Sequence, residues 1–394
     1  MNKLTALFFV IMFLIGTDTF IISPLIPTLQ HLFHIQTEYA GWMVGAYALG
    51  YAIFALIAGP LSDGWDRKKV LLFGMACFSV STILCGSAFS FWSMFLFRVM
   101  AGFGAAFTTP QVWASIPTLF PAQKIPKVFG IVMAGLASAQ AFGMPIGGLL
   151  AATHWSYPFY TIGAFSLLTT VAIFFTMPAM RPNQEQKTTM PIFKRYVLLL
   201  SSRMARRSFL AHLLFQCGFM AAFAFIGKWM TDRFELSVDH VGFVMFFLGL
   251  GNMVGSIGGA HLIKLLGRFT TLVIGFVVSI VCFLILPHLS SVSAFEGVYF
   301  FVFTNMGISF PLIMELLTSL NPTIRGTITS MANSAMYAAT TLGSWIAGLL
   351  YATFNGFTAV GIFAALCITG SLIAFFSSGI LPVQENTKKE LVGS

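Results

Sequence analysis

The chain has 394 residues, of which 57% are hydrophobic and 8% are charged, and its formal net charge is +9. Soluble domains carry a charge on about 25% of their residues, so this composition excludes a soluble globular protein and indicates a chain that lies in a lipid bilayer. The positive charge would suggest nucleic-acid binding in a soluble protein, but here it lies in loops on one side of the membrane, and we expect no nucleic-acid partner.

Twelve apolar segments are long enough to cross about 30 Å of hydrocarbon as helices. Lipid offers no partner for an unpaired backbone group, so we expect all of them to be α-helical. The first segment carries a carboxylate and is followed by two prolines, so we expect it to be a retained helix and not a cleaved signal. The segments run at about 4–26, 40–60, 70–88, 92–113, 127–152, 157–178, 208–230, 241–260, 270–287, 294–318, 327–352 and 357–381.

The carboxylate in the first segment is Asp18, roughly two-thirds of the way across. An ionised carboxylate inside a membrane costs about 2.5–3.5 kcal/mol on insertion scales, so such a residue rarely lacks a role. It is either a proton site or a hydrogen-bonding residue that packs helices together or is wetted from one face. Arg98 lies at a similar depth in the fourth segment and is the expected counter-ion, because a buried guanidinium cannot lose its charge.

A charged hinge, GPLSDGWDRKK at 59–69, joins the second and third segments. The fifth segment contains GMPIGG at 143–148, in which glycines and a proline allow close packing and bending, and we expect it to pack against the eighth segment. Glu315 is the other acid that lies well inside an apolar segment, the tenth. It is either a second proton or cation site or a residue that contacts lipid headgroups or a loop.

Residues 181–207 are polar and basic and are broken by Pro182 and Pro191. We expect this stretch to be a linker, with an interfacial basic helix at its end, between a six-helix bundle at 1–180 and a second one at 208–394.

The second bundle repeats the first. Gly41, Gly50 and Gly74 recur 201 residues later as Gly242, Gly251 and Gly275. After one deletion the offset is 200, and Gly143 and Gly148 recur as Gly343 and Gly348. Each copy crosses the membrane an even number of times, so the two copies have the same orientation and are related by an axis along the membrane normal.

The loops that share a side are strongly basic, which places both termini in the cytoplasm by the positive-inside rule. The opposite side carries only Lys228 and Arg233. The basic residues of the first side are Lys3, Arg67, Lys68, Lys69, Lys124, Lys127, Arg181, Lys187, Lys194, Arg195, Arg203, Arg206, Arg207, Lys264, Arg268, Arg325, Lys388 and Lys389.

Four motifs together resemble one protein family over essentially the whole chain. They are the hinge at 59–69, DTFIISPLIP at 18–27, RVMAGFGAA at 98–106 and GMPIGG at 143–148. The chain resembles the twelve-helix drug:proton antiporters of the major facilitator superfamily. It departs from the family pattern where Met144 splits a Gly-Pro pair and where Asp66 replaces a glycine. The second-half copy of the hinge, AHLIKLLGR at 260–268, has lost the acid.

The resemblance implies an all-α integral membrane protein with twelve transmembrane helices in two pseudo-symmetric six-helix bundles. It implies a gate that docks Asp63 near Thr327 at the start of the eleventh helix, and we expect proton coupling at Asp18 and Arg98, with Glu315 as the candidate for a second coupling site. The other gating positions are Gly59, Arg67, Gly143, Pro145, Gly147 and Gly148, and the candidate cavity residues are Gln111, Trp113, Gln140, Gln216, Asn252, Asn305 and Asn333.

The function implied is proton-coupled export of small lipophilic or amphipathic compounds across a bacterial cytoplasmic membrane by alternating access. We expect a monomer surrounded by lipid, with the proton as coupling ion and no metal or organic cofactor. Export of a defined metabolite such as a sugar or a metal-chelating compound, and proton-coupled uptake, stay open. A membrane enzyme or lipid-handling protein is a more distant alternative, because the chain lacks the usual zinc, nucleotide and serine-hydrolase motifs.

Overall fold

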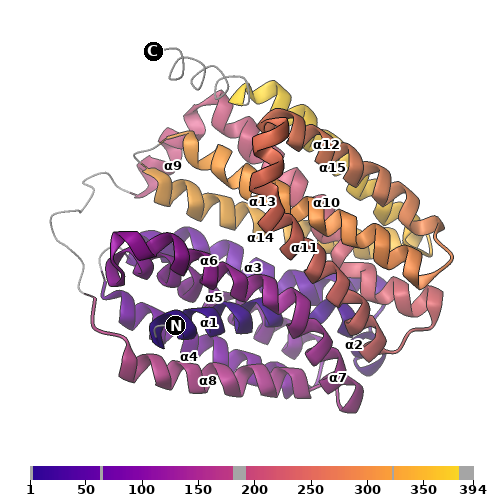
Figure 1. Cartoon of the computed structure of the whole chain (residues 1–394). Coiled ribbons are helices and arrows are strands. Elements are labelled where there is room, and N and C mark those ends of the chain that lie inside the picture. Colours follow the sequence, from indigo (N-terminus) through magenta and orange to yellow (C-terminus); the bar gives the residue numbers. More distant parts are fainter. Residues whose placement is uncertain (1–2, 63–64, 181–191, 322–323, 381–394) are drawn as a thin grey trace.

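The computed structural model describes residues 3–62, 65–180, 192–321 and 324–380. These residues form a bundle of helices in two halves (Figure 1). Asp63, residues 181–191 of the predicted linker, and the C-terminal residues 381–394 lie outside the described residues.

The N-terminal half contains the first six crossings. The first crossing consists of α1 (Lys3–Phe20) and α2 (Ile22–Leu32), and the fifth consists of α6 (Ile125–Ser138), a π-helical turn (Ala139–Gly143) and α7 (Met144–Thr153). The other crossings are α3 (Thr37–Ser62), α4 (Arg67–Gly86), α5 (Phe91–Leu119) and α8 (Tyr157–Thr176), and a short 3₁₀ helix (Ala122–Lys124) precedes α6.

The C-terminal half is preceded by α9 (Ile192–Ser201), a short helix inside the predicted linker. The six crossings are α10 (Arg203–Phe234), α11 (Val238–Leu266), α12 (Arg268–Ile285), α13 (Val292–Ser319), α14 (Arg325–Thr353) and α15 (Thr358–Ser378), and a 3₁₀ helix (Leu286–His288) follows α12. The prediction that all twelve apolar segments are helical is confirmed. Several helices are longer than their apolar segments, because a helix can continue into the polar interface on either side of the hydrocarbon.

Eleven of the described crossings are long and apolar enough to span a membrane by composition alone. The twelfth, α14, is less apolar because it packs against α3 and α10 and not mainly against lipid. Its buried polar side chains include Thr340, Thr341 and Ser344. Polar side chains are tolerated in a membrane helix where neighbouring helices satisfy them, and Thr341 does donate to the carbonyl of Gly45 in α3.

The internal repeat of the sequence reappears as repeated contacts. Gly74 of α4 lies against Gly104 and Thr108 of α5, and Gly275 of α12 lies against Asn305 and Ser309 of α13, which are the positions 201 residues further on. Likewise the guanidinium of Arg67 donates to the carbonyl of Ala114, while that of Arg268 pairs with the carboxylate of Glu315. The two halves are therefore built to the same internal plan.

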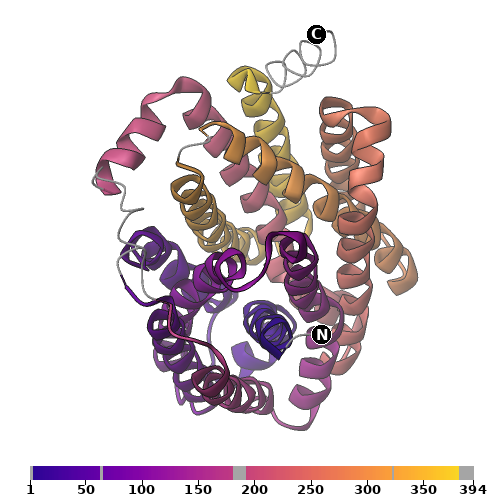
Figure 2. The same cartoon turned by 60° about the vertical axis from the view of Figure 1, so that its left-hand side comes forward.

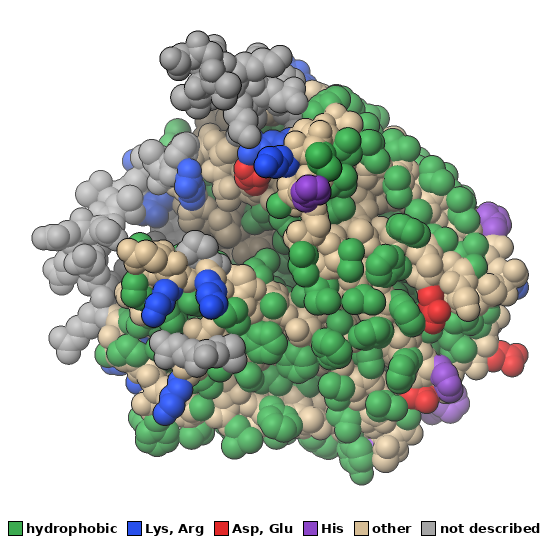
Figure 3. Space-filling view, in the orientation of Figure 1, with side chains coloured by type: hydrophobic (Ala, Val, Ile, Leu, Met, Phe, Trp, Pro, Cys, Tyr) green, Lys and Arg blue, Asp and Glu red, His purple; other side chains and the backbone are tan. Residues whose placement is uncertain are grey.

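Most described Lys and Arg residues lie at one end of the bundle, where α4, α6, α10, α12 and α14 begin; we call it the basic end. Lys228 and Arg233 lie at the other end, which we call the opposite end. Figure 3 shows the basic residues mainly at the left, whereas acidic and histidine side chains lie mainly at the right and in part beside the basic residues. Figure 2 brings the basic end forward, with the N-terminal half below and the C-terminal half above.

The two halves contact each other through α3 and α14, α7 and α11, and α2 and α10. Ser23 of α2 donates to the carbonyl of Phe223 in α10 at 2.6 Å, and Ser334 of α14 donates to that of Ala52 in α3 at 2.7 Å. The contacts between α2 and α10 and between α7 and α11 lie towards the opposite end. Between the halves, nearer the basic end, the surface is hollowed (Figure 3).

Candidate functional site

A buried ion pair lies inside the N-terminal half. Nη1 of Arg98 in α5 donates to Oδ2 of Asp18 in α1 at 2.7 Å, and both side chains are 0% exposed. The expected pairing of these residues is therefore present. Two charges can lie in a low-dielectric interior only when each offsets the desolvation of the other, so the pair joins α1 and α5 through one strong contact.

The hydrogen bonding of this pair is incomplete. Oδ1 of Asp18 and both Nε and Nη2 of Arg98 have no hydrogen-bond partner among the described residues. The guanidinium lies over the ring of Tyr47 in α3, with 4.6 Å between Cζ and the ring centroid, and such a cation–π contact compensates part of its lost hydration. The ring of Tyr337 in α14 stacks on that of Tyr51, 3.7 Å away, and approaches Tyr47 at 6.3 Å. The pair is thus connected through aromatic rings to a helix of the other half.

The glycines of the fifth crossing lie on two different faces. A Cβ on Gly143 would overlap the side chain of Thr17, and one on Gly147 would overlap that of Ile21. The predicted packing of the fifth crossing against the eighth is present, between α7 and α11, but Gly143 and Gly147 face the first crossing, against Thr17 and Ile21 on either side of Asp18. The motif alone does not show which neighbour each glycine faces: Gly143 and Gly147, four residues apart, share a face, whereas Gly148, adjacent to Gly147, points to a different neighbour.

Gly148 does face the eighth crossing. A Cβ there would lie 3.0 Å from the carbonyl of Val238 and 3.2 Å from Cα of Gly242, and Gly242 in turn approaches Pro145 of α7. Gln140, in the π-helical turn, accepts a hydrogen bond from Asn252 of α11 across the two halves. The fifth crossing therefore lies between the first and the eighth, and it connects the surroundings of the ion pair to the interface of the halves.

The remaining candidate cavity residues lie in different surroundings. Asn305 donates to the carbonyl of Gly275 at 2.6 Å and joins α13 to α12. Gln111 is fully buried, seven residues after Gly104 on the face that packs against α4. Trp113 stacks on Phe129 of α6, Gln216 is fully buried without a hydrogen-bond partner among the described residues, and Asn333 is half-buried in α14. Asn305 thus serves packing between helices.

The hinge contributes packing contacts at its described residues. Arg67 donates to the carbonyl of Ala114 and approaches the hydroxyl of Thr118 at 3.5 Å, so it holds α4 against α5. Asp66 caps α4 by accepting from the backbone N–H of Lys68, and it also accepts from that of Met180. Gly59 belongs to the last turns of α3, and the predicted docking of Asp63 near Thr327 lies outside the described residues.

Glu315 lies about one turn before the end of α13, at the basic end, and pairs with Arg268 at the start of α12. Its side chain is 53% exposed. Of the two interpretations from the sequence, this position favours a contact at the membrane surface. Within the described part of the chain, no group of three or more His, Cys, Asp and Glu residues could hold a metal ion.

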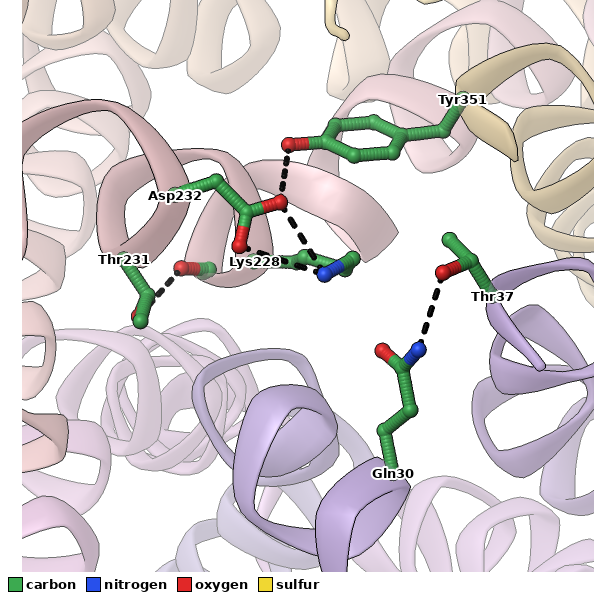
Figure 4. A network of polar contacts seen from close by, with 7 residues as sticks. Gln30, Thr37, Lys228, Thr231, Asp232 and Tyr351 are labelled. Carbon is green, nitrogen blue, oxygen red and sulfur yellow. Dashed lines mark hydrogen bonds and ion pairs between the residues drawn. The ribbon is translucent and has the colours of Figure 1, made fainter. Parts of the chain in front are cut away.

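Sequence reasoning missed a polar network at the opposite end (Figure 4). Lys228 and Asp232, one turn apart in α10, form an ion pair at 3.0 Å, and the hydroxyl of Tyr351 in α14 donates to Asp232 at 2.7 Å. Facing them, Gln30 donates to the hydroxyl of Thr37 at 2.9 Å. The signal that could have found this network is the spacing of four residues between a lysine and an aspartate in an otherwise apolar helix.

This network lines a pocket of about 640 Å³ between the halves. Its lining residues are Gln30, Gln36, Thr37, Glu38, Lys228, Asp232, Tyr351, Ala352 and Asn355.

Comparison with known proteins gives consistent matches over most of the chain. The model of the Major Facilitator Superfamily matches residues 8–344. The uncharacterized MFS-type transporter YceJ of Bacillus subtilis (strain 168) is 46% identical over 375 residues, which cover 95% of this chain and 96% of that protein. Multidrug resistance protein 1 of the same organism is 32% identical over 255 residues, 64% of this chain and 62% of that protein.

A similar solved structure is the crystal structure of a bacterial homologue of the human lysosomal transporter Spinster, in an inward-facing and unoccupied conformation. The TM-score is 0.76 at 15% identity, and the match covers 96% of this chain and 97% of the other.

Proposed function

Because this chain belongs to the major facilitator superfamily of transporters, we propose that it exports small lipophilic or amphipathic compounds in exchange for protons. It is a multi-pass membrane transporter and not an enzyme, and its bacterial relatives imply the plasma membrane. Similarity to a multidrug resistance protein over 64% of the chain supports the direction of transport. The buried pair of Asp18 and Arg98 is the observation that carries the proposal of proton coupling.

Asp18 is the group that takes up the proton in this proposal. Protonation removes the charge of Asp18 but leaves Arg98 fully charged, because a guanidinium does not lose its proton in proteins. The neutral acid attracts the guanidinium less, so the contact between α1 and α5 weakens while the contact with Tyr47 of α3 remains. Proton uptake therefore changes which helices Arg98 holds together.

The fifth crossing transmits this change. Thr17 and Ile21, on either side of Asp18, lie directly against Gly143 and Gly147. On its other face, the same crossing contacts α11 through Gly148 and the hydrogen bond between Gln140 and Asn252. A shift of the first crossing cannot be absorbed at contacts without free space, so it displaces the interface between the halves.

The proposed orientation places the basic end in the cytoplasm, in agreement with the positive-inside rule. The hollow near the basic end then faces the cytoplasm, and substrate enters from there or from the inner leaflet while Asp18 is ionised. Protonation of Asp18 accompanies release on the outer side. The membrane potential contributes about 2.3 kcal/mol per charge per 100 mV to inward proton movement. We propose that the protein works as a monomer, because one chain contains both halves.

The test uses everted membrane vesicles from a pump-deficient bacterial host, energised to an acidic interior. Proton leakage is recorded when lipophilic cations, neutral antibiotics, sugars and chelators are added in turn. We expect leakage with lipophilic compounds for the wild type and none for Asp18→Asn when vesicles with equal amounts of folded protein are compared. The matched control is Asp239→Asn, which removes a carboxylate at the opposite end, outside the ion pair and outside the pocket.

Leakage with sugars or chelators alone would show that these compounds, and not lipophilic ones, are the substrates. Leakage that persists in Asp18→Asn would exclude Asp18 as the coupling group. A folded wild-type protein that gives no leakage with any compound contradicts proton-coupled export.

A further inference from the structure

The pocket at the opposite end is built from both halves, and no hydrogen bond or ion pair between its described lining residues joins one half to the other. Gln30 and Thr37 belong to the N-terminal half and bond to each other, whereas Lys228, Asp232 and Tyr351 belong to the C-terminal half and bond among themselves (Figure 4). A molecule held between these two groups would contact both halves at once. At about 640 Å³, the pocket lies in the size range of small-molecule sites, which is about 300–1,000 Å³.

The charges of the lining favour a cation. Two of its residues carry a carboxylate, Glu38 and Asp232, and one carries an ammonium group, Lys228, which leaves one uncompensated negative charge. Lys228 is not available to an anionic ligand, because it pairs with Asp232 and lies over the ring of Tyr351, 5.6 Å from its centroid. Glu38 is exposed and has no hydrogen-bond or ion-pair partner among the described residues, so its charge is compensated only by solvent.

The partial charges of the helix ends around the pocket also favour a cation. Gln30, Asp232 and Tyr351 lie in the last turn of α2, α10 and α14 respectively, and α3 is the one helix of the four that begins at the pocket. The C-terminal end of a helix carries a partial negative charge from its unpaired carbonyls, so three of the four helix ends attract cations.

The buried lining atom that lacks a partner is an acceptor. Oε1 of Gln30 is buried and has no hydrogen-bond partner among the described residues, while its Nε2 is used by Thr37. The carboxylate of Glu38 is likewise an acceptor. A primary ammonium or a guanidinium supplies both positive charge and N–H donors, whereas a quaternary ammonium supplies charge alone.

We propose that the pocket lined by Gln30, Glu38, Asp232 and Tyr351 is a binding site for an organic cation that carries a primary amine or a guanidinium. The bound cation bridges the two halves and stabilises the conformation in which the halves are in contact at the opposite end of the bundle, because a ligand favours the state that binds it. This site differs from the ion pair of Asp18 and Arg98 in place and in chemistry. Binding at this site requires no proton gradient, so the proposed site can be tested independently of the proposed proton antiport.

The test measures the thermal unfolding of the purified, detergent-solubilised protein as butylammonium chloride is added. Butyltrimethylammonium chloride serves as the probe of equal charge without donors, and sodium chloride serves as the control for ionic strength. We expect a saturable rise of the unfolding temperature with butylammonium that exceeds both controls, because a ligand that binds only the folded state stabilises it.

Three variants test whether the charges of the lining determine the apparent Kd. Removing the uncompensated charge in Glu38→Gln should raise the apparent Kd about tenfold, the effect of about 1.4 kcal/mol expected for one nearby charge in a partly solvated site. Removing the cation in Lys228→Gln should instead lower the apparent Kd. Glu235→Gln should leave it unchanged, because Glu235 lies at the same end of α10 but does not line the pocket.

Equal stabilisation by butylammonium and sodium chloride, or by butylammonium and butyltrimethylammonium, overturns the proposed site. So does a Kd that changes in the same direction in Glu38→Gln and Lys228→Gln, since an electrostatic site requires opposite signs. A variant that does not fold is replaced by Gln30→Leu, which keeps the charge but removes the acceptor and should also weaken binding.

Discussion

At the scale of single residues, Arg98 is the position where charge and burial conflict most strongly. It is the largest fully buried side chain of the described residues, and one carboxylate and one aromatic ring are its recorded partners. The two members of the pair differ in what they can do when the other is removed. Asp18 can become neutral by taking up a proton, whereas Arg98 cannot become neutral.

This difference predicts unequal effects of the two substitutions on stability. Asp18→Asn leaves an unpaired buried cation and should destabilise the folded protein by about 3–5 kcal/mol. Arg98→Gln should destabilise it less, because Asp18 can bind a proton. The measurement is the thermal unfolding of both variants beside the double variant Asp18→Asn/Arg98→Gln, which should be more stable than Asp18→Asn alone. Equal stability of Asp18→Asn and wild type would mean that the pair is wetted.

At the scale of helices, the fifth crossing has two functional faces, one toward the first crossing and one toward the eighth. The sequence pattern GMPIGG indicates close packing but not the neighbour of each glycine. The close contact of Gly147 is with the end of a flexible side chain, that of Ile21, whereas Gly148 approaches the backbone of α11. The two positions should therefore respond differently to compensating changes.

We expect Gly147→Ala to slow transport and to cost about 1–3 kcal/mol of stability by overpacking. Adding Ile21→Ala should restore most of the transport rate, since it removes the atoms that the new methyl group would overlap, whereas the cavity that it leaves keeps the stability below that of the wild type. Gly147→Trp is too large for this rescue and should abolish turnover.

The control for this prediction is Gly148→Ala, which Ile21→Ala should not rescue. Transport rates in vesicles and unfolding temperatures of the purified variants provide the measurements. Rescue of both glycine variants by Ile21→Ala would show that the two faces are not distinct.

At the scale of the whole molecule, the halves are in contact towards the opposite end and the surface is hollowed near the basic end. Hydrogen bonds that join the halves include those of Ser23, Thr341 and Ser334, each to a backbone carbonyl of the other half. Alternating access requires that contacts near the opposite end separate in each cycle. A covalent link between the halves at that end should therefore stop transport.

Gly148 and Gly242 provide positions for such a link. A Cβ on either residue would lie 3.2 to 3.3 Å from the Cα of the other, so the two backbones are in direct contact and two cysteines need only a small outward shift to reach disulfide geometry. The double variant Gly148→Cys/Gly242→Cys, in a background without the five native cysteines, should form a disulfide under oxidising conditions and lose transport. Reduction should restore activity, and each single variant should be insensitive to oxidant. Normal transport by the fully cross-linked protein would exclude opening at this end.

The sequence by itself determined the membrane environment, the twelve helices and the twofold internal repeat. Composition, segment length and recurring glycines report these directly, because every crossing has to span the same hydrocarbon thickness with its backbone hydrogen bonds satisfied within the helix. It also determined the pair of Asp18 and Arg98, since two opposite charges at equal depth in lipid have few other partners.

Only the tertiary structure decided which face each glycine presents, that Asn305 bonds within its own half, and that Glu315 lies at the surface with Arg268. It alone brought Gln30, Glu38, Asp232 and Tyr351 around one pocket. The physical reason is that packing and hydrogen bonds between distant segments decide which helices become neighbours in lipid. The sequence of one helix alone does not show which helix it will contact.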